Sequence, residues 1–284
     1  MKVVYVIILN WNGWQDTVKC IDSLKSLTYP NYKIVVLDNA STNDSVVRIR
    51  EAHPDITVIE TGANLGFAGG NNVGIRYALE HGAGYIWLLN NDTIASPGAL
   101  AAMIEVAESD PKIGAVGSVL YYMNQPEKVQ AWGGGQVNLL TGRSRHLLAP
   151  GDLHYITGAS MLLRREALEQ VGLLDEGFFM YWEDTDLSFR LRQKGWMITV
   201  APNSRVLHKE SASAKKGSSQ QDIWYNASAV RFFRRHAMFP FLPITLGVGG
   251  RILKRLLLGD WRRVRSVWLG YKRGMEATRF TTRG

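Results

Sequence analysis

The sequence predicts an α/β fold of the doubly wound type, in which a mostly parallel sheet is flanked by helices. Short apolar runs rich in β-branched residues alternate with stretches whose apolar residues recur at helical spacing. Three of these runs end abruptly in polar side chains, at Asn10, at Asp38 and at the group from Asn90 to Asp92. Because parallel strands place their carboxyl ends at one edge of a sheet, we expect these polar groups to share a cleft.

Four apolar runs predict the first half of the sheet. Strands are expected at 2–9, 33–37, 56–60 and 85–89, with helices at 16–27, up to about 53 and up to about 81. The first helix is expected to end before the Tyr29-Pro30-Asn31 turn signal. The run at 85–89, YIWLL, follows Gly-Ala-Gly and shows no polar alternation, which is typical of a central strand covered on both faces.

The second half of the chain is less regular. Ser96-Pro97 is typical of a helix start, so a helix is expected at 97–108 and a strand at 113–122. Residues 123–150 are rich in Gly and polar side chains with little periodicity, which favours a long binding loop or lid. The remaining elements are expected as strands at 155–163 and 196–201, helices at 164–171 and from 183 to about 194, and a polar loop at 209–222.

Composition restricts the class of protein. With 284 residues, of which 46% are hydrophobic and 20% charged, the chain can bury a full core and is not disordered. Its single cysteine, Cys20, excludes an internal disulfide and a cysteine-based metal site. Neither a signal peptide nor a run of about 18 apolar residues is found, so a cytoplasmic protein is expected.

The positive charge is concentrated at the end of the chain. Residues 231–284 hold 13 Lys and Arg against two acidic residues, a net charge of +11, so the remainder of the +8 chain carries −3. Aromatic residues alternate with basic clusters here, which predicts a main domain at 1–222 and a C-terminal basic amphipathic helical tail at 223–284. Such helices are typical of peripheral binding to an anionic membrane surface. Packing on the main domain, or on a second copy in a homodimer, is the alternative.

The residues at the strand ends have two interpretations. Asp38 and Asp92 either cap helices or bind a ligand, which would be a base or ribose for Asp38 and a cation holding a phosphate for Asp92. The glycine-rich segment 62–74 lacks the Lys-Ser/Thr ending of a P-loop and does not follow the first strand, as dinucleotide-binding glycines do. Its residues Gly66 and Gly69 still allow a close backbone approach to a ligand.

A second acidic cluster, Glu183, Asp184 and Asp186, follows a block of aromatic residues and opens a predicted helix. Acidic residues in a first turn stabilise the helix dipole, which is the structural interpretation. Crowded carboxylates beside aromatic rings also raise one another's pKa, which suits a general base. His208 follows the last predicted strand, and a lone histidine is by itself more typical of a structural role.

Together these residues resemble the inverting glycosyltransferases of family 2, which have the GT-A fold. The resemblance covers roughly residues 3–210 and consists of an ordered set of short motifs. These are VIILNW at 6–11, LDNAS at 37–41, NLGFAGGNN at 64–72, LNND at 89–92, TGAS at 157–160, WEDTDLSFR at 182–190, and His208. The branch most resembled is the rhamnosyltransferase-like one, which acts in polysaccharide and lipid-linked glycan assembly of the cell envelope.

The resemblance implies roles for single residues. Asp92 and His208 would hold Mg²⁺ or Mn²⁺ on the donor diphosphate, and Asp184 would be the base that deprotonates the acceptor hydroxyl. The residues that would bind the donor nucleotide are Asn10, Asp38, Asn64, Gly66, Gly69, Asn91 and Asp92. Those expected on the acceptor side are Gly158, Trp182, Glu183 and the stretch 123–150. The family's metal motif has two Asp, and here Asn90 occupies the first place, so the site has less negative charge.

The implied function is inverting transfer of a sugar from a UDP- or dTDP-sugar, in particular dTDP-rhamnose, to a hydroxyl of a glycan or lipid-linked acceptor at the inner face of the cell membrane. Two alternatives belong to other classes. A sugar-phosphate nucleotidyltransferase would need basic residues beside a glycine loop near the first strand, and residues 10–18 contain no Arg or Lys. A non-enzymatic binder would use the basic tail, but the acidic cluster would repel the phosphates of a nucleic acid.

Overall fold

The computed structural model describes residues 1–209 and 218–276, so most of the loop expected at 209–222 and the end of the expected tail lie outside the described residues. The strands are β1 Val4–Asn10, β2 Tyr32–Asp38, β3 Thr57–Glu60, β4 Tyr85–Asn90, β5 Thr93–Ala95, β6 Ile113–Tyr122, β7 Gln125–Trp132, β8 Gly134–Asn138, β9 Arg143–His146, β10 Tyr155–Ile156, β11 Ser160–Arg164 and β12 Met197–His208. The helices are α1 Trp14–Leu24, α2 Ser45–Ala52, α3 Gly66–Glu80, α4 Ala99–Ser109, α5 Arg165–Val171, α6 Glu183–Gln193, α7 Ser219–His236, α8 Phe241–Leu257 and α9 Trp261–Glu276.

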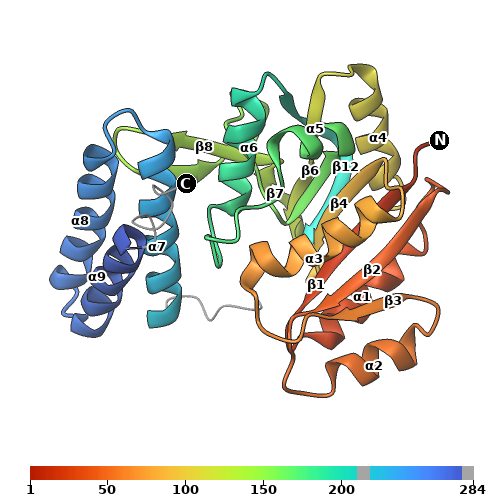
Figure 1. Ribbon diagram of the computed structural model, residues 1–284, viewed down its shortest axis with the longest axis horizontal. Helices are drawn as coiled ribbons and strands as arrows, with labels where there is room; N and C mark the ends of the chain where they lie inside the picture. The colour runs from red at the N-terminus through yellow and green to blue at the C-terminus, as the bar shows by residue number, and fades with distance from the viewer. Residues whose placement is uncertain (210–217, 277–284) are drawn as a thin grey trace.

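The main sheet confirms the predicted doubly wound arrangement (Figure 1). Its strands lie in the order β3-β2-β1-β4-β11-β6-β12-β5, with β7 paired to β6. The first four strands pair in parallel, whereas β11 runs antiparallel between β4 and β6. Asn10 is in register with Asp38, and Leu9 with Asn90, so the predicted polar strand ends lie at one edge of the sheet.

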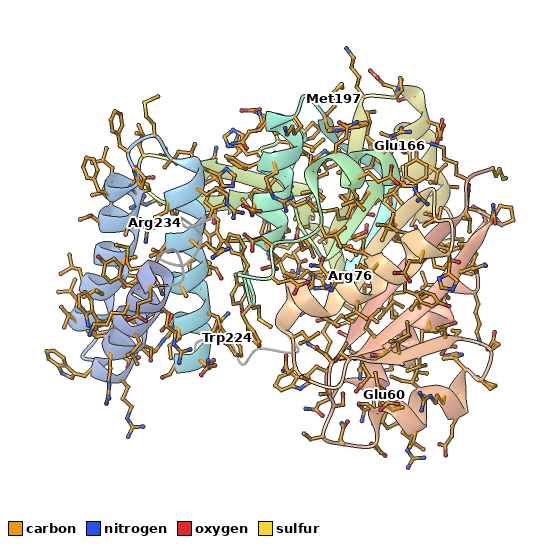
Figure 2. All side chains as sticks on the ribbon, in the orientation of Figure 1. Glu60, Arg76, Glu166, Met197, Trp224 and Arg234 are labelled. Atoms are coloured by element: carbon orange, nitrogen blue, oxygen red, sulfur yellow. The ribbon has the colours of Figure 1, made fainter. Side chains whose placement is uncertain are left out.

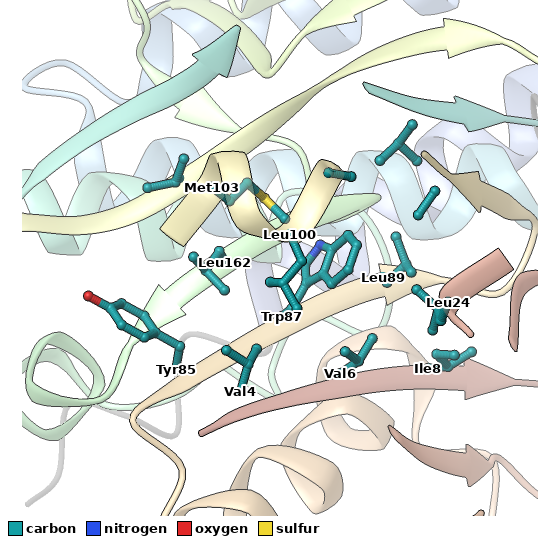
Figure 3. Close-up of a cluster of buried hydrophobic side chains, with 14 of the residues drawn as sticks. Val4, Val6, Ile8, Leu24, Tyr85, Trp87, Leu89, Leu100, Met103 and Leu162 are labelled. Carbon is teal, nitrogen blue, oxygen red and sulfur yellow. The ribbon is translucent and has the colours of Figure 1, made fainter. Parts of the chain in front are cut away.

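Two apolar clusters cover the two faces of this sheet. Val4 and Val6 of β1 belong to the cluster that contains residues of α1 and α4, whereas Tyr5 and Ile7 belong to the cluster that contains residues of α3. Figure 3 shows the first cluster around Trp87 of β4, which is fully buried. Both faces of the central strands are therefore covered by helices, as the unbroken apolar run in β4 predicts.

Residues 123–150 correct the expectation of a long irregular loop, because they contain the strands β7, β8 and β9. β7 folds back antiparallel on β6, and β8 pairs with β9 and β10 in a separate small sheet. A Cβ on Gly134 would lie 1.8 Å from the carbonyl oxygen of Tyr155 in the neighbouring strand. The glycines that suggested a loop instead allow close approach of paired strands.

The last strand extends beyond the expected end at residue 201. β12 pairs in parallel with β6, with a register shift between Ala201 and Arg205, and its end pairs antiparallel with the short strand β5. This second pairing places His208 opposite Thr93, immediately after Asp92. The sequence did not predict β5, because three residues carry too little periodicity to identify a strand.

The tail consists of the helices α7, α8 and α9, which Figure 1 shows beside the main sheet. α7 begins after Ser218, whose Oγ accepts a hydrogen bond from the backbone N–H of Gln221 at 3.1 Å. Phe232 and Phe233 of this helix are buried, and their rings lie 4.8 and 5.2 Å from that of Trp182. Two of the aromatic residues expected to face a membrane thus pack on the main domain. Among the described residues, no helix has the length and apolarity needed to cross a bilayer.

Candidate active site

Two side chains expected to bind metal meet at the carboxyl edge of the sheet. Asp92 follows β4 and His208 ends β12, and the pairing of β5 with β12 brings His208 Nε2 to 3.3 Å from Asp92 Oδ1. His208 Nδ1 lies 2.7 Å from the Oε1 atom of Gln130, which accepts a hydrogen bond from it. The amide nitrogen of Asn90, which can only donate, lies 3.4 Å from His208 Nε2. The contact with Gln130 makes Nδ1 a hydrogen-bond donor, while Nε2 faces both Asp92 and Asn90.

A divalent cation fits this pair of side chains. A carboxylate oxygen of Asp92 and the Nε2 atom of His208 face each other. The carboxylate is an ordinary ligand of Mg²⁺ and Mn²⁺, and the imidazole nitrogen suits Mn²⁺ better than the harder Mg²⁺. The contact of His208 with Gln130 would orient the ring for such a role. Among residues 1–209 and 218–276, no group of three His, Cys, Asp or Glu side chains could hold a metal ion. A cation here would therefore take further oxygens from a bound diphosphate.

Asp184 is held at the N-terminus of α6 by hydrogen bonds to both carboxylate oxygens. Its Oδ2 accepts from the backbone N–H of Gly158 at 2.8 Å, and its Oδ1 accepts from the backbone N–H of Thr185 at 2.6 Å and from the Thr185 hydroxyl at 3.1 Å. Burial raises the pKa of Asp184, and these hydrogen bonds partly oppose the rise. A carboxylate with a raised pKa that stays partly stabilised in its ionised form is suited to accept a proton.

The neighbouring acid Glu183 has a different environment. Burial, reinforced by the charge of Asp184, raises the pKa of Glu183 well above its usual value. Its Oε2 atom is buried and has no hydrogen-bond partner among the described residues. The two acids therefore differ: the pKa of Glu183 is raised further than that of Asp184, so Asp184 is the acid of the pair that ionises more readily.

Asp186, the third acid of the cluster, does not line the pocket described below. Its carboxylate accepts hydrogen bonds from Arg190 Nε at 2.7 Å and Arg235 Nη1 at 2.8 Å, and His236 Nε2 lies 2.8 Å from it. Burial raises the pKa of Asp186, but the contacts with His236, Arg190 and Arg235 outweigh burial and lower it to about 2. Asp186 thus ties α6, which carries Asp184, to the tail helix α7.

Most of the predicted site residues line one pocket of ≈ 470 Å³. Asp92 and His208 lie on its wall together with Asp184, although 92 residues separate the two aspartates in the chain. The other predicted residues on the wall are Asn64, Gly66, Asn91, Gly158, Trp182 and Glu183. A single molecule in this pocket can reach both acidic centres. The three predicted residues that do not line the pocket are Asn10, Asp38 and Gly69.

Asn10 and Asp38 form a buried network behind the pocket. Asn10 Nδ2 donates to Asp38 Oδ1 at 2.7 Å, and its Oδ1 accepts from the Thr17 hydroxyl at 2.8 Å. Asp38 also accepts from the hydroxyl and the backbone N–H of Ser41, at 2.6 and 2.9 Å. Asn91, which lines the pocket, donates to Thr17 at 3.0 Å and so joins this network. Direct binding of the nucleotide by Asn10 and Asp38 stays a prediction.

The glycines of the segment 62–74, most of which lies in α3, have a packing role that the sequence did not reveal. Gly66 has a φ of +71°, and a Cβ there would lie 2.1 Å from the carbonyl oxygen of Phe179. The backbone N–H of the following residue, Phe67, donates a hydrogen bond to the same carbonyl oxygen at 2.7 Å. A Cβ on Gly69 would meet Leu65 at 2.8 Å. Both glycines therefore allow close contact within the protein, and only Gly66 also borders the pocket.

Several pocket residues were not singled out from the sequence. Gln130 comes from β7, His146 from β9 and Tyr155 from β10, all in or beside the stretch expected on the acceptor side. Trp224 and Tyr225 come from α7, so the tail forms part of the pocket wall. Figure 2 shows Trp224 on the side of α7 that faces the main sheet. In the sequence, Trp224 and Tyr225 stand out only as aromatic residues. The amphipathic pattern of the tail accounts for aromatic residues there without any pocket.

The pocket wall contains features that a folded protein usually avoids. Six buried side-chain nitrogen or oxygen atoms lack a hydrogen-bond partner among the described residues. Three of them, Gln130 Nε2, Trp182 Nε1 and Glu183 Oε2, belong to residues on this wall. Tyr181 and Trp182 also have positive φ angles of 70° and 71°. Unpaired buried atoms and a strained backbone at one place are typical of a ligand site.

The chain is similar to known proteins over most of its length. The sequence model of the family described as "Glycosyl transferase family 2" matches residues 5–172. The chain is 26% identical over 280 residues to the N-acetylglucosaminyl-diphospho-decaprenol L-rhamnosyltransferase of Mycobacterium tuberculosis, a match that covers 89% of this chain and 91% of that protein. It is 24% identical over 253 residues to Rhamnosyltransferase WbbL of Escherichia coli, which covers 82% and 93% of the two chains.

Solved structures show the same fold. The mannosyltransferase PcManGT of Pyrobaculum calidifontis, in complex with GDP-Man and Mn²⁺, superposes with a TM-score of 0.62 at 20% identity and covers 100% of this chain and 76% of that one. GalNAc-T7, with UDP, GalNAc and Mn²⁺, gives a TM-score of 0.69 at 15% identity and covers 97% and 56%. These similarities confirm the GT-A-type fold expected from the sequence motifs.

Proposed function

This chain belongs to glycosyl transferase family 2, and we propose that it transfers a sugar from a nucleotide-diphosphate donor to a hydroxyl of a glycan or lipid-linked acceptor, with inversion at the anomeric carbon. The observation that carries the proposal is the shared pocket of Asp92, His208 and Asp184. A donor whose diphosphate lies at Asp92 and His208 would have its sugar between these two residues and Asp184. The relatives that act on rhamnose favour dTDP-rhamnose as the donor.

The donor side of the pocket stabilises the leaving group. Asp92 and His208 are the residues that would hold Mg²⁺ or Mn²⁺, which supplies positive charge to the departing diphosphate when bound. Asn90 stands where a second aspartate is expected, and its neutral amide lowers the negative charge that faces the diphosphate. Asn64 and the Gly66 backbone border the same pocket and are the proposed contacts of the nucleotide.

The acceptor side supplies the base. Asp184 accepts the proton of the acceptor hydroxyl while the oxygen attacks the anomeric carbon on the face opposite to the diphosphate. The new glycosidic bond forms as the bond from the anomeric carbon to the diphosphate breaks, so the configuration inverts. Because burial and the charge of Asp184 raise the pKa of Glu183 further than that of Asp184, Asp184 is the carboxylate that we assign to this step. General-base help of this kind contributes about 10²- to 10⁴-fold in rate.

A thermal-shift panel of nucleotide-sugars tests the donor assignment. We expect one dTDP- or UDP-sugar to raise the melting temperature in the presence of Mn²⁺, with no rise after addition of EDTA. A donor at a hundred times its Kd stabilises by about 2.7 kcal/mol, which corresponds to a shift of about 5–10 °C in a protein of this size. If no nucleotide-sugar shifts the melting temperature with Mn²⁺ present, the proposed donor class is wrong.

The tail offers a surface for peripheral attachment to an anionic membrane at its cytoplasmic face. Apolar side chains of α8, α9 and the turns that flank α8 are exposed, namely Met238, Phe239, Phe241, Leu246, Leu253, Leu256, Leu257, Leu258, Trp261, Trp268 and Leu269. Exposed basic residues lie among them, including Lys254, Arg262 and Arg265. Apolar side chains that insert below the headgroups, with cations at headgroup level, match an anionic leaflet. This attachment would bring the pocket to a lipid-linked acceptor.

Flotation with phosphatidylglycerol vesicles tests this attachment. Removal of residues 231–284 would also remove the buried Phe232 and Phe233, so exposed side chains are the better target. We expect Leu257→Ser with Trp261→Ser to weaken vesicle binding at least about tenfold, because each side chain loses favourable burial. The matched control is Val47→Ser with Leu148→Ser, which changes two exposed apolar residues of the main domain. Equal flotation of both double variants would exclude the tail as the membrane contact.

A further inference from the structure

Gln130 interrupts the regular pairing of β7 with β6. Val129 and Ala131 lie opposite two consecutive residues of β6, so Gln130 between them has no opposite residue and forms a bulge. In a regular strand, two consecutive side chains point to opposite faces. Gln130 and Ala131 nevertheless both line the active-site pocket. The bulge therefore adds one polar side chain to the pocket wall.

The amide of Gln130 is only half used within the protein. Its Oε1 atom accepts a hydrogen bond from His208 Nδ1 at 2.7 Å. Its Nε2 atom is buried and has no hydrogen-bond partner among the described residues. A buried N–H group without an acceptor is unfavourable, and such groups are rare in folded proteins. The N–H of Gln130 is therefore available to an oxygen of a molecule in the pocket.

The order of the strands indicates which part of the donor reaches Gln130. Asn64 and Gly66, the proposed contacts of the nucleotide, follow β3 in the chain, whereas Asp92 follows β4. In the sheet, β4 lies between β3-β2-β1 on one side and β11-β6 on the other. β7 pairs with β6, and Figure 1 shows it on the side of β4 away from β2. A donor with its nucleotide at Asn64 and its diphosphate at Asp92 therefore has its sugar on the side of Gln130.

We propose that Gln130 Nε2 donates a hydrogen bond to a hydroxyl of the transferred sugar, so that Gln130 is a specificity-determining residue of the donor site. Leu120 and Ala131, both buried, line the pocket beside it and offer apolar surface to the sugar ring. A site that pairs a buried donor with a hydroxyl rejects a sugar without that hydroxyl, because the donor then stays unpaired. The inference rests on the proposed function, because it concerns the donor of that reaction.

Calorimetric titrations of the full chain with dTDP-rhamnose and with dTDP, both in Mn²⁺, test this contact. Gln130→Met keeps the length of the side chain and removes both polar atoms. Loss of the contact with His208 weakens both ligands by the same factor, whereas loss of the contact with the sugar weakens dTDP-rhamnose alone. We therefore expect the ratio of the Kd for dTDP-rhamnose to the Kd for dTDP to rise about three- to tenfold.

Gln125→Met is the matched control for Gln130→Met. Gln125 is an exposed residue of the same strand and does not line the active-site pocket, so the ratio should change less than about twofold. Gln130→Asn keeps the amide but withdraws it by one methylene group, and it should raise the ratio as well. This variant decides the question if Gln130→Met does not fold. An unchanged ratio in the folded Gln130 variant would show that Gln130 positions His208 and does not contact the sugar.

Monodeoxy forms of dTDP-rhamnose, each without one ring hydroxyl, identify the contacted group. We expect one of them to bind the wild-type protein about three- to tenfold more weakly than dTDP-rhamnose and to bind Gln130→Met as well as dTDP-rhamnose does. The two changes remove the two ends of one hydrogen bond, so their effects should not add. Additive losses for every monodeoxy form would contradict a contact between Gln130 and a sugar hydroxyl.

Sugar transfer separates this inference from the proposed function. A protein that shows the expected change of ratio in Gln130→Met but transfers no sugar would contradict the proposed function and leave the Gln130 contact standing. A protein that transfers sugar but keeps its ratio unchanged in Gln130→Met would contradict the Gln130 contact alone. A wild-type protein that binds neither dTDP nor dTDP-rhamnose in Mn²⁺ would contradict both the proposed donor and the contact with its sugar.

Discussion

Asp184→Asn is expected to lower turnover at least about a hundredfold while donor affinity stays close to that of the wild type. Asparagine has the shape of aspartate and can still accept the hydrogen bond from the Gly158 N–H, but it cannot take a proton from the acceptor. The measurement is kcat in a transfer assay, with donor affinity from calorimetry. Turnover close to that of the wild type would remove Asp184 from the role of base.

The pH dependence of the wild-type enzyme follows from the same residue. The base acts when it is ionised, so turnover falls as the pH falls through its pKa. Because burial raises the pKa of Asp184, this loss is expected at a higher pH than for an exposed aspartate. A profile of kcat from about pH 4 to about pH 8 should show this acidic limb, and the residual activity of Asp184→Asn should lack it.

Glu183→Gln is the matched comparison for Asp184→Asn. Burial raises the pKa of Glu183 well above its usual value and so favours its neutral form, which glutamine matches closely in shape and charge. We therefore expect a much smaller loss of turnover than in Asp184→Asn. If Glu183→Gln lost as much turnover or more, the base would be Glu183, and the assignment of the charge within the pair would be wrong.

Asp92→Ala is expected to weaken binding of the nucleotide-sugar about 10- to 100-fold in Mn²⁺ and to leave it unchanged in EDTA. The loss of one charged ligand is worth about 1.5–3 kcal/mol, which corresponds to this range. His208→Ala should act in the same direction, since its Nε2 faces Asp92 at 3.3 Å. The measurement is a calorimetric titration of the donor with and without chelator.

Asp55→Ala is the control for Asp92→Ala, because Asp55 is an exposed aspartate between α2 and β3 and does not line the pocket. It removes the same charge and should not change donor affinity in either condition. Equal donor affinities of Asp92→Ala and the wild type in Mn²⁺ would contradict the metal assignment. A loss of the same size in EDTA would show that Asp92 contacts the donor directly.

Much of the fold could be predicted from local sequence patterns. The four parallel strands and the helices between them follow from unbroken β-branched runs and from apolar residues at helical spacing. The prediction failed at 123–150, because the glycines that suggested a loop are needed where strands approach closely, as at Gly134. It also missed β5, which is too short to show a period but sets the place of His208.

The candidate site was predictable in its residue types and less so in its geometry. Asp92, Asp184 and His208 stand out in the sequence as polar residues at the ends of apolar runs. Trp224 and Tyr225 do not, because an aromatic pair in an amphipathic helix is equally compatible with a membrane face, a dimer contact or a pocket wall. Their place on the wall results from the docking of α7 on Trp182.

The order of strands and helices and the polar residues at their ends follow from the sequence alone, because both are properties of neighbouring residues. Which polar residues meet was decided by contacts between distant parts of the chain. The pairing of β5 with β12 brings His208 to Asp92, and the packing of α6 beside the sheet brings Asp184 to the same pocket, while Asn10 and Asp38 remain in a buried network. Strand register and helix docking depend on the whole packed core, and no local pattern records them.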